Sequence, residues 1–194
     1  MAQQQELIRK FVQQQQAIMY GPPFESLRVR MNEMALEDLK QIPMTRETAD
    51  VGASSDMHYT HEFKEQLLMD TEGVINGEYQ KWITDRCFDA WAKIEFKGKK
   101  LTIGAFGLKS ADDCPNRDPT SVKVSYLDEE GVSVEVGKFE LNFEQKRHHL
   151  LKFKVPTCRT TEMKFDFHHD HHDHFQLNRI LFYTADELLG EIEE

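Results

Sequence analysis

The sequence predicts a mainly β protein: an antiparallel β-sandwich preceded by an N-terminal helical arm. Two observations carry this prediction. From about residue 48 onward, apolar and polar residues alternate with a period of two, as they do in strands that bury one face and expose the other. Before residue 45, apolar residues instead recur with a helical period. Many short strands separated by turn residues favour a sandwich or a barrel.

The arm, residues 1–45, contains two amphipathic segments. The first covers residues 6–19 and the second covers residues 26–42, which Pro43 ends. Helices of this length are only marginally stable alone in water, so their apolar stripes must pack against something. They either dock a protein partner by helix-in-groove packing or fold back onto the sandwich. The stripe residues, which we predict to bind a partner, are Leu7, Ile8, Phe11, Val12, Ile18, Met19, Leu27, Met31, Met34 and Leu39.

The sandwich is predicted to occupy residues 46–184. The alternation is clearest in residues 91–96, 122–126 and 151–155, where each second side chain is apolar. Asp128–Gly131 has the composition of a hairpin turn between two of the strands. The acidic residues 185–194 form a C-terminal tail or a short helix.

Composition limits the function classes. The 194 residues suffice for one domain and an appendage, and the net charge of −10 argues against nucleic acid or an anionic membrane as the partner. No segment approaches the apolar length of a membrane span. The three cysteines are widely spaced, which favours free thiols, a reducing compartment and hence the cytoplasm.

The sequence carries no signature of catalysis. It lacks the nucleophile-elbow, phosphate-loop and zinc-protease motifs, and no local pattern pairs a thiol with a base. We therefore expect a binding protein and not an enzyme.

The His-rich segment 167–175 is the most conspicuous local feature. Imidazole and carboxylate suit Zn²⁺, Ni²⁺ or Cu²⁺, and in an extended chain His168, Asp170, His172 and His174 would share one face. The alternative is a solvated hairpin loop between two strands, which we favour for biological function. Any Zn²⁺ or Ni²⁺ bound here would then be adventitious, and we expect no resident cofactor.

Two loops carry oxygen ligands of the kind that Ca²⁺ prefers. The ordinary interpretation is that these side chains cap turns and pair with neighbours, and we favour it for both loops. The candidate calcium ligands are Asp112, Asp113, Asn116 and Asp118 in one loop, and Asp70 with Thr84 in the other. Trp82 and Trp91 offer rings for stacking on a sugar, but we expect both in the core.

Three pieces of the sequence carry a family resemblance. They are the entry Ala53-Ser54-Ser55-Asp56, the passage from Leu67-Leu68-Met69-Asp70 through Gly73 to Trp82-Ile83-Thr84, and the strand Trp91–Phe96. In this order and spacing they resemble the discoidin, or coagulation-factor type C, group of galactose-binding-like domains. The resemblance implies a jelly-roll sandwich over roughly residues 48–184. The chain departs from secreted members because it lacks their terminal cysteine pair, and Thr71-Glu72 separates Asp70 from Gly73.

The Ser-Ser-Asp entry is also similar to that of intracellular members, such as a small intraflagellar-transport subunit. This resemblance implies a non-catalytic interaction or scaffold subunit of a larger intracellular assembly, in a cilium or elsewhere on the cytoskeleton. The alternative is a glycan-binding module, calcium-dependent or not. Its site would lie in the loops 70–84 and 110–118.

Overall fold

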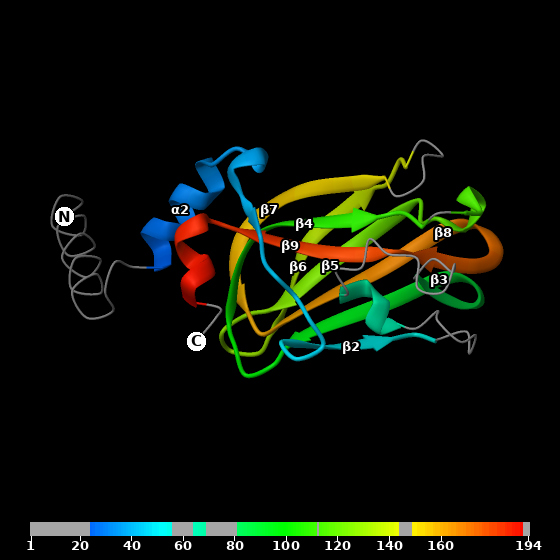
Figure 1. The fold of residues 1–194 in the computed structure, drawn as a ribbon, viewed down its shortest axis with the longest axis horizontal. Helices are drawn as coiled ribbons and strands as arrows, with labels where there is room; N and C mark the ends of the chain where they lie inside the picture. The colour runs from blue at the N-terminus through cyan, green and yellow to red at the C-terminus, as the bar shows by residue number, and fades with distance from the viewer. Residues whose placement is uncertain (1–23, 56–63, 69–80, 112, 144–148, 192–194) are drawn as a thin grey trace, which may run out of the picture.

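The computed structural model describes residues 24–55, 64–68, 81–111, 113–143 and 149–191. Two antiparallel sheets pack face to face, one with strand order β1-β9-β4-β7 and the other with order β2-β3-β8-β5-β6 (Figure 1). The helical elements are α2 (Phe24–Glu33), η1 (Leu36–Asp38), η2 (Lys64–Leu68), η3 (Pro115–Arg117) and η4 (Asp186–Glu191). The strands are β1 (Lys40–Gln41), β2 (Ala49–Ala53), β3 (Trp82–Phe96), β4 (Leu101–Lys109), β5 (Ser121–Leu127), β6 (Ser133–Glu140), β7 (Leu150–Thr160), β8 (Glu162–Leu177) and β9 (Arg179–Thr184).

The main core lies between the two sheets and is rich in phenylalanine. The ring of Phe106 on β4 stacks on Phe153, with centroids 5.2 Å apart, and meets Phe165 edge-on at 5.5 Å. Phe182 on β9 packs against Phe96 in the same edge-on manner. The contacts with Phe165 and Phe96 join the two sheets, as the period-two pattern of the strands predicts.

A second apolar cluster lies on the outer face of the four-stranded sheet. Met31 from α2 and Leu39 are buried there against Leu181 and Tyr183 of β9, and Leu188 of η4 joins them. Every residue of β9 is buried because the core covers one face of this strand and the helical elements cover the other (Figure 1).

Polar contacts fasten α2 to the sheet. The side-chain oxygen of Asn32 accepts hydrogen bonds from the backbone N–H of Thr157, at 2.8 Å, and from its hydroxyl, at 3.0 Å. The ammonium group of Lys154 donates to the carbonyls of Asn32 and Met34, where the helix leaves carbonyls without intrahelical partners. Arg30 forms an ion pair with Glu187 of η4.

The predicted partner-binding residues of the second amphipathic segment therefore pack on the protein itself. Leu27, Met31, Met34 and Leu39 all belong to the second cluster, so the alternative of folding back describes this segment. The helix is also shorter than the predicted 26–42: it ends at Glu33, and Lys40–Gln41 already pairs with β9 as the edge strand of the four-stranded sheet. The remaining predicted residues, Leu7, Ile8, Phe11, Val12, Ile18 and Met19, lie outside the described residues.

The structure confirms one further local prediction and contradicts another. Asp128–Gly131 forms the predicted hairpin turn, with Gly131 at φ 78° and the Asp128 carboxylate accepting the backbone N–H of Val132 at 2.7 Å. The His-rich segment is not a hairpin loop, since β8 runs through it from Glu162 to Leu177. Within the part of the chain described, no helix has the length and hydropathy of a membrane span.

Candidate functional site

Strands β3 and β8 bend together at one end of the sandwich. Their pairing is regular from Asp89 opposite His168 to Glu95 opposite Glu162, and it resumes with Cys87 opposite Asp173. Between these stretches, β8 has three more residues than β3 has, which is a register shift of the kind that re-aims side chains. The His-rich segment forms this bend, and η3 packs beside it (Figure 1).

Gln176 ties the loop after β4 to this end. Its amide nitrogen donates to the carbonyls of Asp113, at 2.7 Å, and Cys114, at 3.0 Å, and lies 3.2 Å from the carboxylate of Asp118. Gln176 and Asp118 are both buried. The amide thus lies among oxygen atoms of the loop that the sequence analysis offers as a candidate calcium site, and it donates hydrogen bonds to that loop.

Two ion pairs flank this amide. The ammonium group of Lys81 lies 2.7 Å from the carboxylate of Asp113, so the segment before β3 contacts the loop after β4. Arg117 of η3 pairs with Asp173 at 3.4 Å, and both side chains are partly exposed. A hydrogen bond from the backbone N–H of His174, together with Arg117, lowers the pKa of Asp173. We call Lys81, Asp113, Arg117, Asp118, Asp173 and Gln176 the end cluster.

Two histidines of the bend form hydrogen bonds with backbone carbonyls of β3. His169 is buried and donates its Nε2 proton to the carbonyl of Cys87 at 2.6 Å, while His174 donates its Nδ1 proton to the carbonyl of Thr84 at 2.9 Å. Burial lowers the pKa of His169, so this ring is neutral at neutral pH. These contacts fix the bend to the first half of β3.

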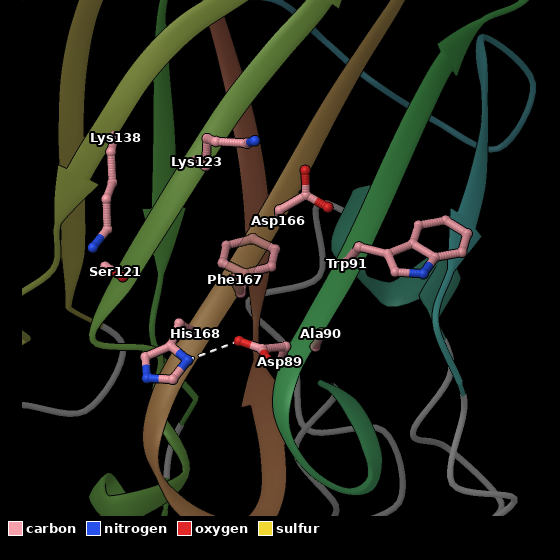
Figure 2. A pocket seen from close by; sticks show the side chains of 9 residues that line it. All are labelled: Asp89, Ala90, Trp91, Ser121, Lys123, Lys138, Asp166, Phe167 and His168. Atoms are coloured by element: carbon pink, nitrogen blue, oxygen red, sulfur yellow. Dashed lines mark hydrogen bonds and ion pairs between the residues drawn. The ribbon is translucent and has the colours of Figure 1, made fainter.

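A groove lies on the outer face of the five-stranded sheet beside the bend. Its volume is about 520 Å³ and it crosses β3, β8, β5 and β6 (Figure 2). His168 donates from Nδ1 to the carboxylate of Asp89 at 2.7 Å, the contact drawn as a dashed line in Figure 2. We call this the sheet groove; its polar or aromatic lining residues are Asp89, Trp91, Ser121, Lys123, Lys138, Asp166, Phe167 and His168.

Strand register arranges the groove into two neighbouring rows. In one row, Trp91 of β3 lies opposite Asp166 of β8, which lies opposite Lys123 of β5, which lies opposite Lys138 of β6. The adjacent row begins with Asp89 and His168 and continues to Ser121. Two lysines therefore face each other directly across β5 and β6.

The predicted metal ligands do not come together among the described residues. No group of three or more His, Cys, Asp or Glu side chains in the described part of the chain is placed to hold a metal ion. His168 and His174 contact different partners, and Asp113 and Asp118 are engaged by Lys81 and Gln176. Asp70, Asp112 and the side chain of His172 lie outside the described residues, so a metal site that includes them stays a prediction.

The two tryptophans differ. Trp82 is buried as predicted, and its indole N–H donates to the carbonyl of Ser55 at 2.9 Å. Trp91 is not a core residue: the alternation of β3 buries Ala90 and Ala92, so the ring of Trp91 lies on the outer face with 36% of its surface exposed. The three cysteines are free thiols, as the sequence predicts.

Sequence reasoning missed Gln176 and most of the sheet groove. The lysines and aspartates of the groove occupy the polar positions of alternating strands, which are ordinarily a solvated face. Only the register of four strands shows that they are neighbours. Gln176 carried only a weak signal: it is a polar residue between Phe175 and Leu177, at the start of the last predicted strand.

Comparison with known proteins supports the fold. No protein family model matches the sequence, and no curated protein matches it. Several solved structures do match the fold of this chain. A CBM32 domain of Clostridium perfringens, in complex with GalNAc-β-1,3-galactose, superposes with a TM-score of 0.60 at 11% identity, covering 75% of this chain and 100% of that one.

Two further structures agree. A fucose-binding module of Streptococcus pneumoniae gives a TM-score of 0.58 at 13% identity, covering 76% of this chain and all (100%) of the module. The F5/8 type C domain of a Bacteroides fragilis protein gives 0.60 at 15% identity, covering 76% of this chain and 97% of that domain. The chain therefore has the discoidin-like, galactose-binding-like sandwich fold that the sequence resemblance implies.

Proposed function

We propose that this protein is a non-catalytic carbohydrate-binding module that holds a sugar at the end cluster. The observation that carries the proposal is the convergence of three segments at one end of the sandwich. Lys81 before β3, Asp113 and Arg117 in the loop after β4, and Asp173 in the bend of β8 are joined by ion pairs. The glycan alternative of the sequence analysis places its site in two of these segments.

The end cluster has the chemistry that sugar recognition requires. Sugar hydroxyls are read by fixed donors and acceptors, and Gln176 holds the loop so that Arg117 and Asp173 keep their positions. Phe88, on the bend of β3, leaves about half (48%) of its surface exposed, which provides an apolar face of the kind that packs against a pyranose ring. Loops on a rigid sandwich commonly carry binding residues.

The structural neighbours support this proposal over the scaffold hypothesis. They include a domain in complex with GalNAc-β-1,3-galactose, a lectin domain in complex with Lewis b and a fucose-binding module. None of the neighbours compared describes an intracellular scaffold. The arm residues Leu27, Met31, Met34 and Leu39 pack on the sandwich, so a protein-docking role would rest on the first amphipathic segment.

Isothermal titration calorimetry with GalNAc-β-1,3-galactose and with fucose tests the proposal. We expect at least one of the two sugars to bind the full chain, and Arg117→Gln to weaken that binding at least tenfold, since hydrogen bonds to a charged group contribute about 1.5–3 kcal/mol. Arg159→Gln is the matched control, because Arg159 is an exposed arginine on β7 away from the end cluster. Equal binding by the wild type and Arg117→Gln would place the sugar elsewhere, and no binding of either sugar would overturn the proposal.

A further inference from the structure

The sheet groove contains two facing lysines that take no part in the end cluster. Lys123 and Lys138 lie directly opposite each other on neighbouring strands, an arrangement in which like charges repel and destabilise the sheet. A bound anion between the two ammonium groups would relieve this repulsion.

The acidic side chains in and near the groove already have partners. Asp166 pairs with Lys164 at 2.7 Å, and Asp89 accepts the Nδ1 proton of His168 at 2.7 Å. The carboxylates of Glu135 and Glu140 lie 3.7 Å and 3.5 Å from Lys123 and Lys138 respectively. These last two pairs are highly exposed, so water and salt screen them and a ligand can replace them at little cost.

The opposite side of the groove offers an aromatic surface. Trp91 is partly exposed, and the ammonium group of Lys164 lies 5.9 Å from its ring centre. Figure 2 shows Trp91 on β3 and the two lysines on β5 and β6, with Asp166 between them and with Ser121 and the His168–Asp89 pair in the adjacent row. Three strand spacings separate β3 from β6, about 14 Å, which is room for more than one sugar ring.

We propose that the sheet groove is a second carbohydrate site, selective for an acidic sugar. The carboxylate or sulfate of this sugar lies between Lys123 and Lys138. The rest of the glycan extends across Ser121 and the His168–Asp89 pair towards Trp91. The choice of a sugar rests on the proposed function of the module; the anionic group follows from the facing lysines alone.

Four probes separate the parts of this proposal: galactose, galacturonic acid, galactose 6-sulfate and inorganic sulfate. They are titrated into the ¹⁵N-labelled full chain at low ionic strength, and the backbone signals of β5, β6 and β8 are followed. We expect at least one acidic sugar to bind the groove about tenfold more tightly than galactose does, as charge-assisted hydrogen bonds provide. The two acidic probes show whether a carboxylate or a sulfate is preferred.

The variant Lys123→Gln/Lys138→Gln should abolish this preference. Lys100→Gln is the matched control, because Lys100 is a similarly exposed lysine, 3.8 Å from Glu129, that does not line the groove. A preference that survives the double substitution, or an absence of any preference in the wild type, overturns the proposal. Inorganic sulfate binding as tightly as galactose 6-sulfate would overturn the sugar part of it.

Failure of the proposed function gives a different result. If the end cluster does not bind sugar, GalNAc-β-1,3-galactose and fucose leave the signals of residues 113–118 unmoved, whatever happens in the groove. If the groove proposal fails, the signals of β5 and β6 show no lysine-dependent response to the acidic sugars. Arg117→Gln should change the first response and leave the second as it is.

Discussion

Asn32, at the end of α2, accepts two hydrogen bonds from Thr157 on β7 through one side-chain oxygen, at 2.8 Å and 3.0 Å. Thr157 is buried, so both of its donors depend on this oxygen for satisfaction. The contact joins residues 125 positions apart in sequence and holds the second amphipathic segment against the sandwich.

Asn32→Ala should therefore destabilise the domain by about 1–3 kcal/mol, since it leaves buried donors unpaired. Asn32→Asp keeps an acceptor at the same position and is the control, with a smaller loss expected. Urea unfolding of the two variants measures the difference. Equal stability of Asn32→Ala and the wild type would contradict the role given to this contact.

A larger residue at Gly104 on β4 should be tolerated better when the side chain of Met31 on α2 is shortened. A Cβ atom on Gly104 would lie 2.8 Å from the terminal methyl of Met31 and 3.4 Å from Leu39, so Gly104→Val crowds the second cluster. We expect a cost of about 1–3 kcal/mol for this substitution alone.

Met31→Ala opens the same space and should cost about 2–5 kcal/mol by itself. Because the new valine would fill part of that space, the double variant should be more stable than the sum of the single losses implies, by about 0.5–3 kcal/mol. A thermodynamic cycle from urea unfolding provides the measurement. Strict additivity would show that α2 does not lie on β4 in solution.

His169 should make stability depend on pH. Burial lowers its pKa in the folded state below the unfolded value of about 6.5. Between these two pKa values the unfolded chain binds the proton and the folded chain does not, so stability falls as the pH falls through this window and is full above about pH 6.5.

His169→Gln removes this titration and keeps a donor for the carbonyl of Cys87. The variant should therefore lose less stability than the wild type does between pH 7.5 and the acidic end of the window, whatever its stability at neutral pH. Unfolding free energies at a series of pH values give the comparison. Two parallel pH profiles would mean that His169 does not control this dependence.

Gln176→Glu should convert the end cluster into an oxygen site. The substitution removes the amide that donates to Asp113 and Cys114 and puts a carboxylate beside Asp118, so we expect a loss of about 1–3 kcal/mol without metal. Oxygen ligands without a donor among them suit Ca²⁺, which should restore part of the loss.

Gln176→Met is the control for this substitution. It also loses the amide, yet it adds no charge, so Ca²⁺ should not stabilise it more than it stabilises the wild type. Thermal unfolding with Ca²⁺ and with EDTA distinguishes the variants. An equal Ca²⁺ response in all three proteins would contradict the position of the amide among the oxygen atoms of this loop.

The period-two alternation was sufficient to predict the sandwich, because inward positions such as Ile94 and Phe165 must meet a second sheet. The helical stripe of Met31 and Leu39 showed that an apolar face needed a cover, but not which surface would supply it. The signal lay in β9, where Ile180, Leu181 and Phe182 are consecutive apolar residues. A strand without alternation is covered on both faces.

The functional residues were harder to predict because they depend on tertiary register. His168 looked like part of a loop, yet β3 extends far enough to pair with it and to place Asp89 within 2.7 Å. Lys123 and Lys138 are separated by a turn in the sequence and face each other only in the folded sheet. Local patterns identify polar positions; pairing between strands decides which of them become neighbours.

Mapping of backbone chemical shifts during titration of the full chain with GalNAc-β-1,3-galactose and, separately, with fucose shows whether the end cluster binds a sugar. We expect that, with at least one of these sugars, the shifting signals concentrate in residues 81–88, 113–118 and 171–176. Arg117→Gln should raise the sugar concentration needed for the same shifts at least tenfold. If neither sugar moves any signal, or if the shifts lie on α2 and the four-stranded sheet, the end of the sandwich is not a sugar site.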